Sequence, residues 1–222
     1  YIINTNNNLR TVFSDGFLEV SNSLNNNYFP LCIGGDHTIA ISSIFASNEY
    51  CLYNNYNLGV LWFDAHADFN TMTTSFSYNL HGMPVSILCG HDLYSLSYGS
   101  FLEPSQFAYY GLRDIDSFEF IRFQQYNMLS LDNEEQLDEW IKKYDYLHLS
   151  FDMDCLDPND FGGVNTKVKN GPSIENINKM LDKIKMSNKL ISMDIVEYNP
   201  TIEKNNSVII NILKKLFNKS KL

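Results

Sequence analysis

The chain has 222 residues, 44% of them hydrophobic and 19% charged, which is the composition of a globular protein with one sizeable core. Its formal net charge of −10 disfavours nucleic acid and anionic membrane surfaces as partners. No segment approaches the roughly 18 consecutive apolar residues of a membrane span, so we expect no membrane partner.

The first half of the chain alternates between helical and strand patterns. Apolar residues recur at helical spacing over residues 9–24, and a short apolar strand follows at 31–33. A helix is predicted over 38–46, directly after a Gly-Gly-Asp-His turn. Residues 58–63 are almost all apolar, which is typical of a strand buried on both faces of a parallel sheet.

The same alternation continues to the end of the chain. We predict a helix at 83–88, strand at 107–111, helix at 118–126, strand at 128–131, helix at 132–143, strand at 146–151, helix from Ser173 to 186, strand at 190–193 and helix at 207–218. This pattern predicts the α/β class, with a mostly parallel sheet sandwiched between helices and right-handed crossovers. Because no repeat or linker interrupts it, we expect a single domain over residues 1–222.

The four cysteines indicate a reducing compartment. They are Cys32, Cys51, Cys89 and Cys155, and no two have the C-x-x-C spacing. Cys32 and Cys155 fall in or beside predicted strands, where a thiol is most often a small buried residue. Unpaired thiols are typical of reducing compartments, so we expect a cytoplasmic location.

Three residues that can bind a metal follow the strand at 58–63. They are Asp64, His66 and Asp68, and in an extended chain side chains at i, i+2 and i+4 point the same way. Open α/β sheets place ligands beyond the carboxyl ends of their strands, so this cluster predicts a divalent metal site. A solvated Asp-rich loop with a helix cap is the alternative.

A second acidic strand end favours the metal interpretation. The strand at 146–151 leads into Asp152 and Asp154, and His37 follows the strand at 31–33. Two acidic strand ends would repel each other unless cations lay between them. These residues, together with those of the first cluster, are six candidate metal ligands.

Five motifs resemble those of the arginase/ureohydrolase family of binuclear manganese enzymes. They are Gly-Gly-Asp-His at 34–37, Asp-Ala-His-Ala-Asp at 64–68, His-Gly-Met-Pro-Val at 81–85, Ser-Phe-Asp-Met-Asp at 150–154 and Asp-Ile-Val-Glu-Tyr-Asn-Pro at 194–200. They occur in the family's order along almost the whole chain. The resemblance implies an arginase-like α/β/α fold with an eight-stranded sheet. About six strands are predicted here, so we expect the N-terminal strands of that fold to be missing.

The resemblance also implies two Mn²⁺ ions per chain. One would be held by His37, Asp64, Asp68 and Asp152, and the other by Asp64, His66, Asp152 and Asp154, with Asp64 and Asp152 bridging. Four carboxylates and two imidazoles form a hard, oxygen-rich set that suits Mn²⁺. Two ions roughly 3.5–4 Å apart lower the pKa of a shared water, which would supply the hydroxide for guanidinium hydrolysis.

Three catalytic residues are implied by the same motifs. His81 resembles the family's proton shuttle, a general acid for the departing amine. Asp68 would bond the attacking hydroxide and pass its proton to the leaving nitrogen, and Glu197 would pair with the substrate guanidinium. The alternatives are a loop histidine for His81 and a helix-start acid for Glu197. His148 matches no motif and fits a structural role in a strand.

The segment from Asn70 to His81 is expected to determine substrate specificity. In arginases it supplies an Asn and hydroxyls to the amino-acid end of the substrate, although a Ser/Thr/Asn-rich stretch can also be a plain loop. The matching substrate-binding candidates are Asn70, Ser75 and Ser77, with Asp116 and Glu119 for the α-amino group. Thr166 is retained within an Asn-Thr-Lys-Val segment at 165–168 that departs from the family's usual Gly-Thr-Pro-Val.

The function implied is metal-dependent hydrolysis of L-arginine, a small-molecule substrate, to L-ornithine and urea. Family members are commonly trimers or hexamers, so we expect a homo-oligomer, with a homotrimer as the simplest case. The alternatives are another ureohydrolase (agmatinase, guanidinobutyrase or formiminoglutamase) or a non-catalytic arginase-like protein. Retention of all six ligand positions favours an enzyme.

Overall fold

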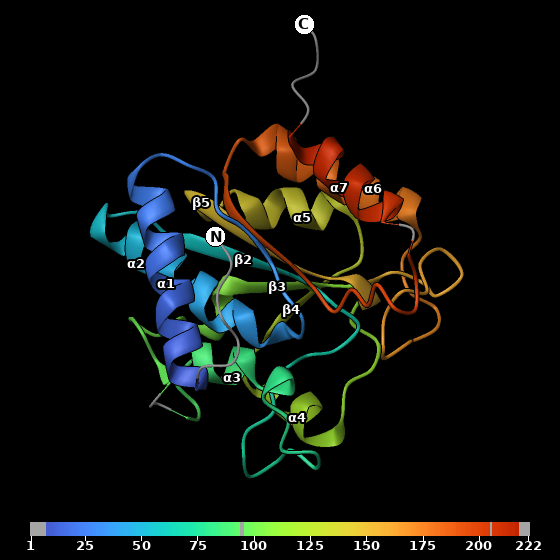
Figure 1. Ribbon diagram of the computed structural model, residues 1–222, viewed down its shortest axis with the longest axis horizontal. Helices are drawn as coiled ribbons and strands as arrows, with labels where there is room; N and C mark the ends of the chain where they lie inside the picture. The colour runs from blue at the N-terminus through green and yellow to red at the C-terminus, as the bar shows by residue number, and fades with distance from the viewer. Residues whose placement is uncertain (1–7, 94–95, 205, 218–222) are drawn as a thin grey trace, which may run out of the picture.

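The computed structural model describes residues 8–93, 96–204 and 206–217, and this part of the chain forms one six-stranded sheet. The strands are β1 (Leu31–Ile33), β2 (Leu58–Phe63), β3 (Phe107–Tyr110), β4 (Leu129–Leu131), β5 (Tyr146–Asp152) and β6 (Leu190–Val196). Their order is β1-β6-β5-β2-β3-β4, and every pairing is parallel, so all the carboxyl ends lie at one edge (Figure 1). The predicted α/β class is confirmed.

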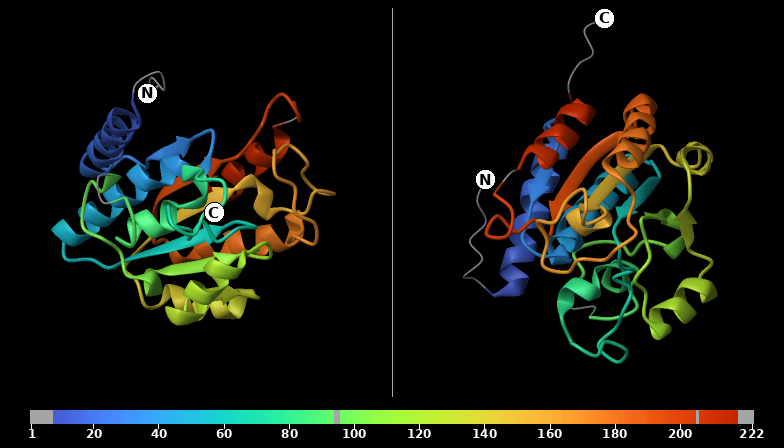
Figure 2. Two further views of the ribbon diagram at one scale, coloured as in Figure 1. Left: turned by 90° about the horizontal axis from the view of Figure 1, so that it is seen from below. Right: turned by 90° about the vertical axis from the view of Figure 1, so that its right-hand side faces the viewer.

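Helices cover both faces of the sheet (Figure 2). They are α1 (Leu9–Asn25), α2 (Ala40–Tyr53), α3 (Pro84–Leu88), α4 (Ser117–Gln125), α5 (Glu134–Ile141), α6 (Ile174–Ser187) and α7 (Ser207–Phe217). Helices α1, α2 and α3 pack on one face with Val60 and Trp62, and α5, α6 and α7 pack on the other with Leu61 and Phe63. Within the described ranges, no helix is long and apolar enough to cross a membrane.

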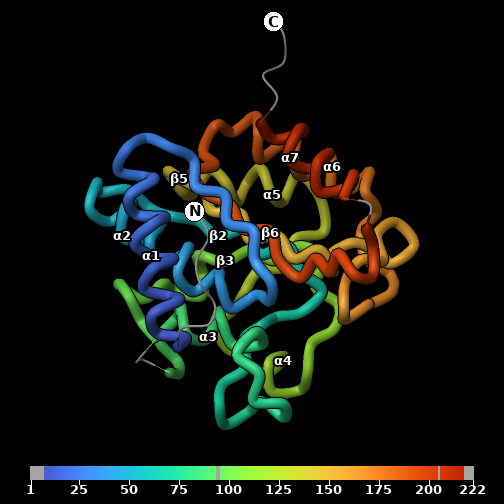
Figure 3. Tube along the Cα trace, in the orientation of Figure 1, coloured from blue at the N-terminus to red at the C-terminus, as the bar shows by residue number. Residues whose placement is uncertain are grey.

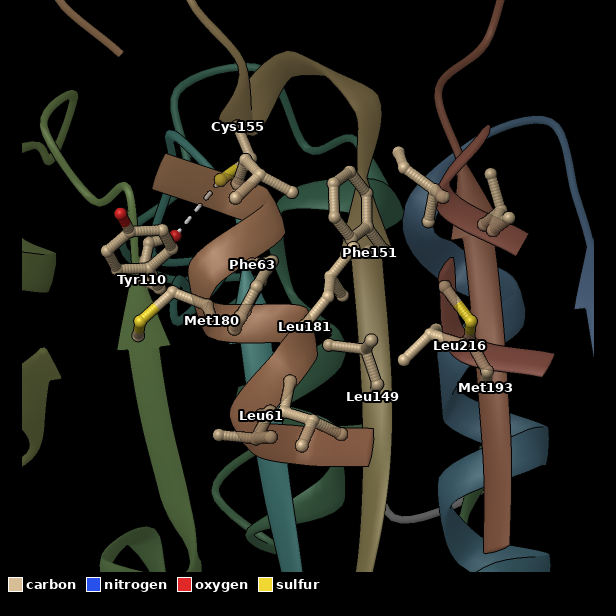
Figure 4. Close-up of a cluster of buried hydrophobic side chains, with 14 of the residues drawn as sticks. Leu61, Phe63, Tyr110, Leu149, Phe151, Cys155, Met180, Leu181, Met193 and Leu216 are labelled. Atoms are coloured by element: carbon tan, nitrogen blue, oxygen red, sulfur yellow. Dashed lines mark hydrogen bonds between the residues drawn. The ribbon is translucent and has the colours of Figure 1, made fainter. Parts of the chain in front are cut away.

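The core beneath α6 aligns the two central strands (Figure 4). Leu61 and Phe63 of β2 pair in register with Leu149 and Phe151 of β5, and all four side chains are fully buried. Leu181 of α6 belongs to the same cluster. Burial of each such side chain stabilises the fold by roughly 1.5–3 kcal/mol. The acidic residues that follow β2 and β5 therefore start from fixed, adjacent positions.

The predicted elements are found, with boundary shifts that have physical reasons. A short 3₁₀ turn spans His37–Ile39, and α2 then continues to Tyr53 rather than to 46, with Ser47, Asn48 and Cys51 buried on its inner face. Helix α5 starts at Glu134 because the Asn133 side chain accepts a hydrogen bond from the helix and caps it.

Strand β6 runs to Val196, three residues beyond the predicted end at 193, because Asp194 is buried inside the sheet. The last predicted residue of the final helix, 218, lies outside the described residues. The connections that leave β2, β5 and β6 lie side by side at the carboxyl edge of the sheet (Figure 3).

Candidate metal centre and active site

The predicted ligands come together at the carboxyl edge of the sheet. Asp64 directly follows β2, and Asp152 ends the neighbouring β5. Two groups result, each with its donor atoms within 4.8 Å of one another: the first group is His37, Asp64 and Asp152, and the second group is Asp64, His66 and Asp154. Because Asp64 belongs to both groups, the arrangement has the form of two adjacent cation positions that share a carboxylate.

A bend after β2 places His66 and Asp68. The extended geometry expected over 64–68 is wrong, because β2 ends at Phe63 and Asp68 has a left-handed backbone with a φ of 49°. The Asp64 Oδ1 atom accepts a 2.7 Å hydrogen bond from the His66 N–H, which forms a local turn. Asp64 Oδ2 and Asp68 Oδ2 nevertheless lie 2.9 and 3.1 Å from the same atom, His37 Nδ1. His66 Nδ1 lies 3.4 Å from Asp64 Oδ1, so the three side chains converge despite the bend.

His37 directs one ring nitrogen at the carboxylates. Its Nδ1 atom lies 2.9, 3.1 and 3.3 Å from carboxylate oxygens of Asp64, Asp68 and Asp152. Despite these short distances, the buried Nδ1 makes no hydrogen bond of acceptable geometry in the described part of the chain. The other nitrogen, Nε2, lies 2.9 Å from the Ser150 hydroxyl. An unsatisfied nitrogen amid three carboxylates is the position expected of a metal-ligating imidazole.

The charges in this cluster fit divalent cations. Burial and the neighbouring Asp64 carboxylate raise the pKa of Asp68 to about 7, and burial with two neighbouring acids raises that of Asp152 well above its usual range. Burial alone would lower the pKa of His66, but hydrogen bonds to Asp154 and Asp64 raise it to about 12. Without cations the cluster retains protons, and hard divalent ions suit the same oxygen and imidazole donors.

Glu197 and His81, predicted as catalytic, lie beside this cluster. Glu197 follows the end of β6 with a φ of 62°, and its N–H donates to the Gly35 carbonyl at 2.7 Å. No helix begins there, so the helix-start interpretation is wrong. Burial raises the pKa of Glu197, whereas the nearby His81 and His37 lower it. His81 lies in an exposed 3₁₀ turn, where it can exchange protons with solvent.

Asn70 and Asp116 bond directly to each other. The Asn70 amide donates to Asp116 Oδ2 at 2.7 Å, and Asp116 Oδ1 caps α4 by accepting from two backbone N–H groups. Glu119 is 6% exposed and accepts hydrogen bonds from the Phe69 and Asp116 N–H groups. Burial raises the Glu119 pKa to about 7. In this arrangement Glu119 holds the start of the 70–81 segment against α4.

The three remaining candidates are hydroxyl residues near the surface. Ser75 Oγ accepts from the Tyr78 N–H at 3.0 Å, and Ser77 Oγ lies 3.5 Å from Ser75 Oγ. Thr166 is exposed on the connection between β5 and α6. Within the described ranges, no hydrogen bond joins Thr166 to the other candidate residues.

A family model decides the assignment. The model for the arginase family matches residues 3–217. The chain belongs to the arginase family. An arginase of Staphylococcus aureus (strain COL) is 38% identical over 204 residues, an alignment that covers 85% of this chain and 66% of that protein. The chain thus spans about two thirds of the length of such curated relatives.

Solved arginase structures have the same fold. A crystal structure of arginase from Bacillus subtilis matches with a TM-score of 0.88 and 30% identity, covering 100% of this chain and 83% of that one. The Entamoeba histolytica arginase in complex with L-ornithine matches with a TM-score of 0.87 and 31% identity, covering 95% and 76%. The family resemblance drawn from the five motifs is confirmed.

A buried polar network behind His37 was missed by sequence reasoning. Asp194 is completely buried, and its Oδ2 lies 2.9 Å from His148 Nε2, 2.8 Å from Ser43 Oγ and 3.4 Å from Ser150 Oγ. His148 and Ser192 pair across β5 and β6, as do Ser150 and Asp194. Polar residues at alternate positions in two otherwise apolar strands were the available signal. The network confirms the structural interpretation of His148, and it connects through Ser150 to the candidate ligand His37.

Proposed function

We propose that this arginase-family protein hydrolyses the guanidinium group of L-arginine to L-ornithine and urea, using two Mn²⁺ ions. The observation that carries the proposal is the pair of overlapping ligand groups that share Asp64. The first group, joined by Asp68, would hold one ion and the second group, joined by Asp152, the other. The Entamoeba histolytica arginase was crystallised with L-ornithine, which supports this product.

When bound, the two ions would lower the pKa of a shared water, and their positive charge would balance the negative charge of the buried carboxylates. Glu197 then orients the substrate, because a carboxylate accepts two parallel hydrogen bonds from a planar guanidinium. Its half-buried position strengthens that pairing relative to one in water. The water oxygen adds to the guanidinium carbon, and the bond from that carbon to the side-chain nitrogen of arginine breaks.

The leaving nitrogen requires a proton, and two residues can provide one. Asp68 can take a proton from the attacking water at a carboxylate oxygen and pass it to the departing nitrogen. His81 is exposed, so its imidazole can collect protons from solvent and deliver them to the ornithine amine. This division leaves Asp68 with the internal transfer and His81 with the exchange to water.

The 70–81 segment gives the site its preference for an amino acid. Asn70, Ser75 and Ser77 carry donors for an α-carboxylate, and Asp116 carries an acceptor for an α-ammonium group. The hydrogen bond between Asn70 and Asp116 holds these two residues side by side, as recognition of two groups on the same α-carbon requires. Glu119 positions them from beneath, and Thr166 would contact substrate from the opposite loop.

Three further properties belong to the proposal. The four free thiols support a cytoplasmic location. Family resemblance alone supports a homo-oligomer, either a trimer or a hexamer. Residues 1–222 would act as one arginase-like catalytic domain, because strands from both halves of the chain contribute to the candidate site.

Urea release from L-arginine and from agmatine, measured with added Mn²⁺, tests the substrate assignment. Agmatine lacks the α-carboxylate, so donors of the 70–81 segment would stay unpaired and kcat/KM should be at least about tenfold lower. An Asp152→Asn variant serves as the inactive control. Equal or higher kcat/KM for agmatine would indicate another ureohydrolase. No urea from either compound, with Mn²⁺ bound, would indicate a non-catalytic protein.

A further inference from the structure

Arg113 stands at the junction between β3 and the candidate metal centre. It follows the end of β3 by three residues, and the N–H groups of Arg113 and Asp114 both donate to the Ala65 carbonyl at 2.9 Å. Ala65 lies between Asp64 and His66, two members of the second ligand group. The backbone at Arg113 is therefore tied directly to the segment that carries those ligands.

In the part of the chain that the structure describes, the Arg113 guanidinium donates only to backbone carbonyls. Nη1 donates hydrogen bonds to the carbonyl oxygens of Gly111 at 2.6 Å and Cys155 at 3.0 Å, and Nε donates to that of Lys169 at 3.1 Å. Nη2 bonds the carbonyls of Asp154 at 2.9 Å, Leu156 at 3.3 Å and Val168 at 2.8 Å. Across the described residues, no ion pair joins Arg113 to a carboxylate. Its planar, fixed fork of donors is thus used to hold three stretches of backbone together.

The chain also approaches this guanidinium too closely to admit a larger residue. A Cβ added at Gly171 would lie 2.7 Å from Arg113 Nη2, from the Asp157 nitrogen and from the Cys155 carbonyl oxygen. Asp157 Oδ2 accepts from the Gly171 N–H at 3.1 Å, which closes the loop over residues 157–171. The loop therefore wraps around Arg113 and depends on its donors for its shape.

We propose that Arg113 is a positioning residue that sets the backbone of Asp154 and thereby forms the cation position of the second ligand group. This inference rests on the proposed metal-dependent function. Asp154 Oδ2 lies 3.1 Å from His66 Nδ1, and Asp154 Oδ1 accepts from the Ala65 N–H at 3.2 Å. A shift of the Asp154 backbone would separate these atoms. Among the described residues, no hydrogen bond joins Arg113 to the first ligand group, which lacks Asp154.

The test compares Arg113→Lys with Arg10→Lys, a matched substitution at an exposed position of α1. Lysine carries one compact ammonium and cannot reproduce six carbonyl contacts from a planar fork. Equilibrium dialysis of the whole chain against Mn²⁺ alone, with elemental analysis, measures both ions without reference to activity. We expect Arg113→Lys to keep one ion and to bind the other at least about tenfold more weakly. Arg10→Lys should match the parent protein.

Limited proteolysis of the metal-free protein gives a second readout, with faster cleavage expected within 157–171 for Arg113→Lys. Gly171→Ala should reproduce the selective loss of one ion with Arg113 intact, and it decides the matter if Arg113→Lys does not fold. Two ions bound at parental affinity would overturn the inference. Equal weakening of both ions would also overturn it, since that indicates a general folding role. Neither result depends on whether the protein releases urea.

Discussion

The Asp194 network makes a prediction whose size follows from its contacts. In Asp194→Asn, an amide replaces a buried carboxylate that accepts from His148, Ser43 and Ser150. The acceptor of these three hydrogen bonds is then neutral instead of charged. The amide NH₂ takes the position of Oδ1, which has no partner in the described part of the chain. Each hydrogen bond that loses its charged acceptor weakens by about 1 kcal/mol, so the three together bring the expected loss to about 3 kcal/mol. For a chain of this size, that lowers Tm by roughly 6–12 °C.

Thermal unfolding of the metal-free protein, followed by circular dichroism, measures this loss. The matched control is Asp182→Asn, which removes a partly exposed partner of Lys215 at 2.6 Å and should cost under about 1 kcal/mol. Because Ser150 also contacts His37 Nε2, Asp194→Asn should in addition weaken one Mn²⁺ more than the other. A Tm change no larger than that of Asp182→Asn would refute the reasoning.

Other predictions address the site itself. Asp152→Asn should lose both Mn²⁺ and activity. Glu197→Gln should keep the metal and lose about 10²-fold in kcat/KM, as measured by urea release together with metal analysis. Normal turnover by Glu197→Gln would show that Glu197 does not orient the substrate. Asn70→Ala should raise the arginine KM without metal loss, and an unchanged KM would count against that contact. The raised pKa values of Asp68 and His66 mean that the folded metal-free protein binds more protons than the unfolded chain above about pH 4. Its Tm should therefore fall between about pH 5 and about pH 8 while stabilisation by Mn²⁺ grows, and a Tm that rose with pH would show the sign to be wrong.

The sequence was most informative where one physical rule acted alone. The apolar run of β2 had no alternative to a doubly buried strand, and the acidic residues after β2 and β5 had to share one edge of a parallel sheet. Parallel pairing follows from the alternation of helices and strands, so the meeting of Asp64 with Asp152 was predictable.

Other features depend on tertiary contacts that local patterns do not encode. The left-handed backbone of Asp68 depends on the turn that follows β2, not on residue spacing. Asp194 is a carboxylate inside a strand, which local rules disfavour, and its partners lie 44 or more residues away in the sequence. The contacts of Arg113 are made with carbonyls, and side-chain identities say nothing about where a carbonyl will point.

The most direct test of the account is urea formation from L-arginine measured against Mn²⁺ bound per chain. Protein stripped of metal is loaded stepwise, and bound metal and urea are determined on the same samples. We expect little urea with one ion bound, a steep rise as the second ion binds, and loss of activity on chelation. Full activity in the stripped protein, or no urea with two ions bound, would contradict the account.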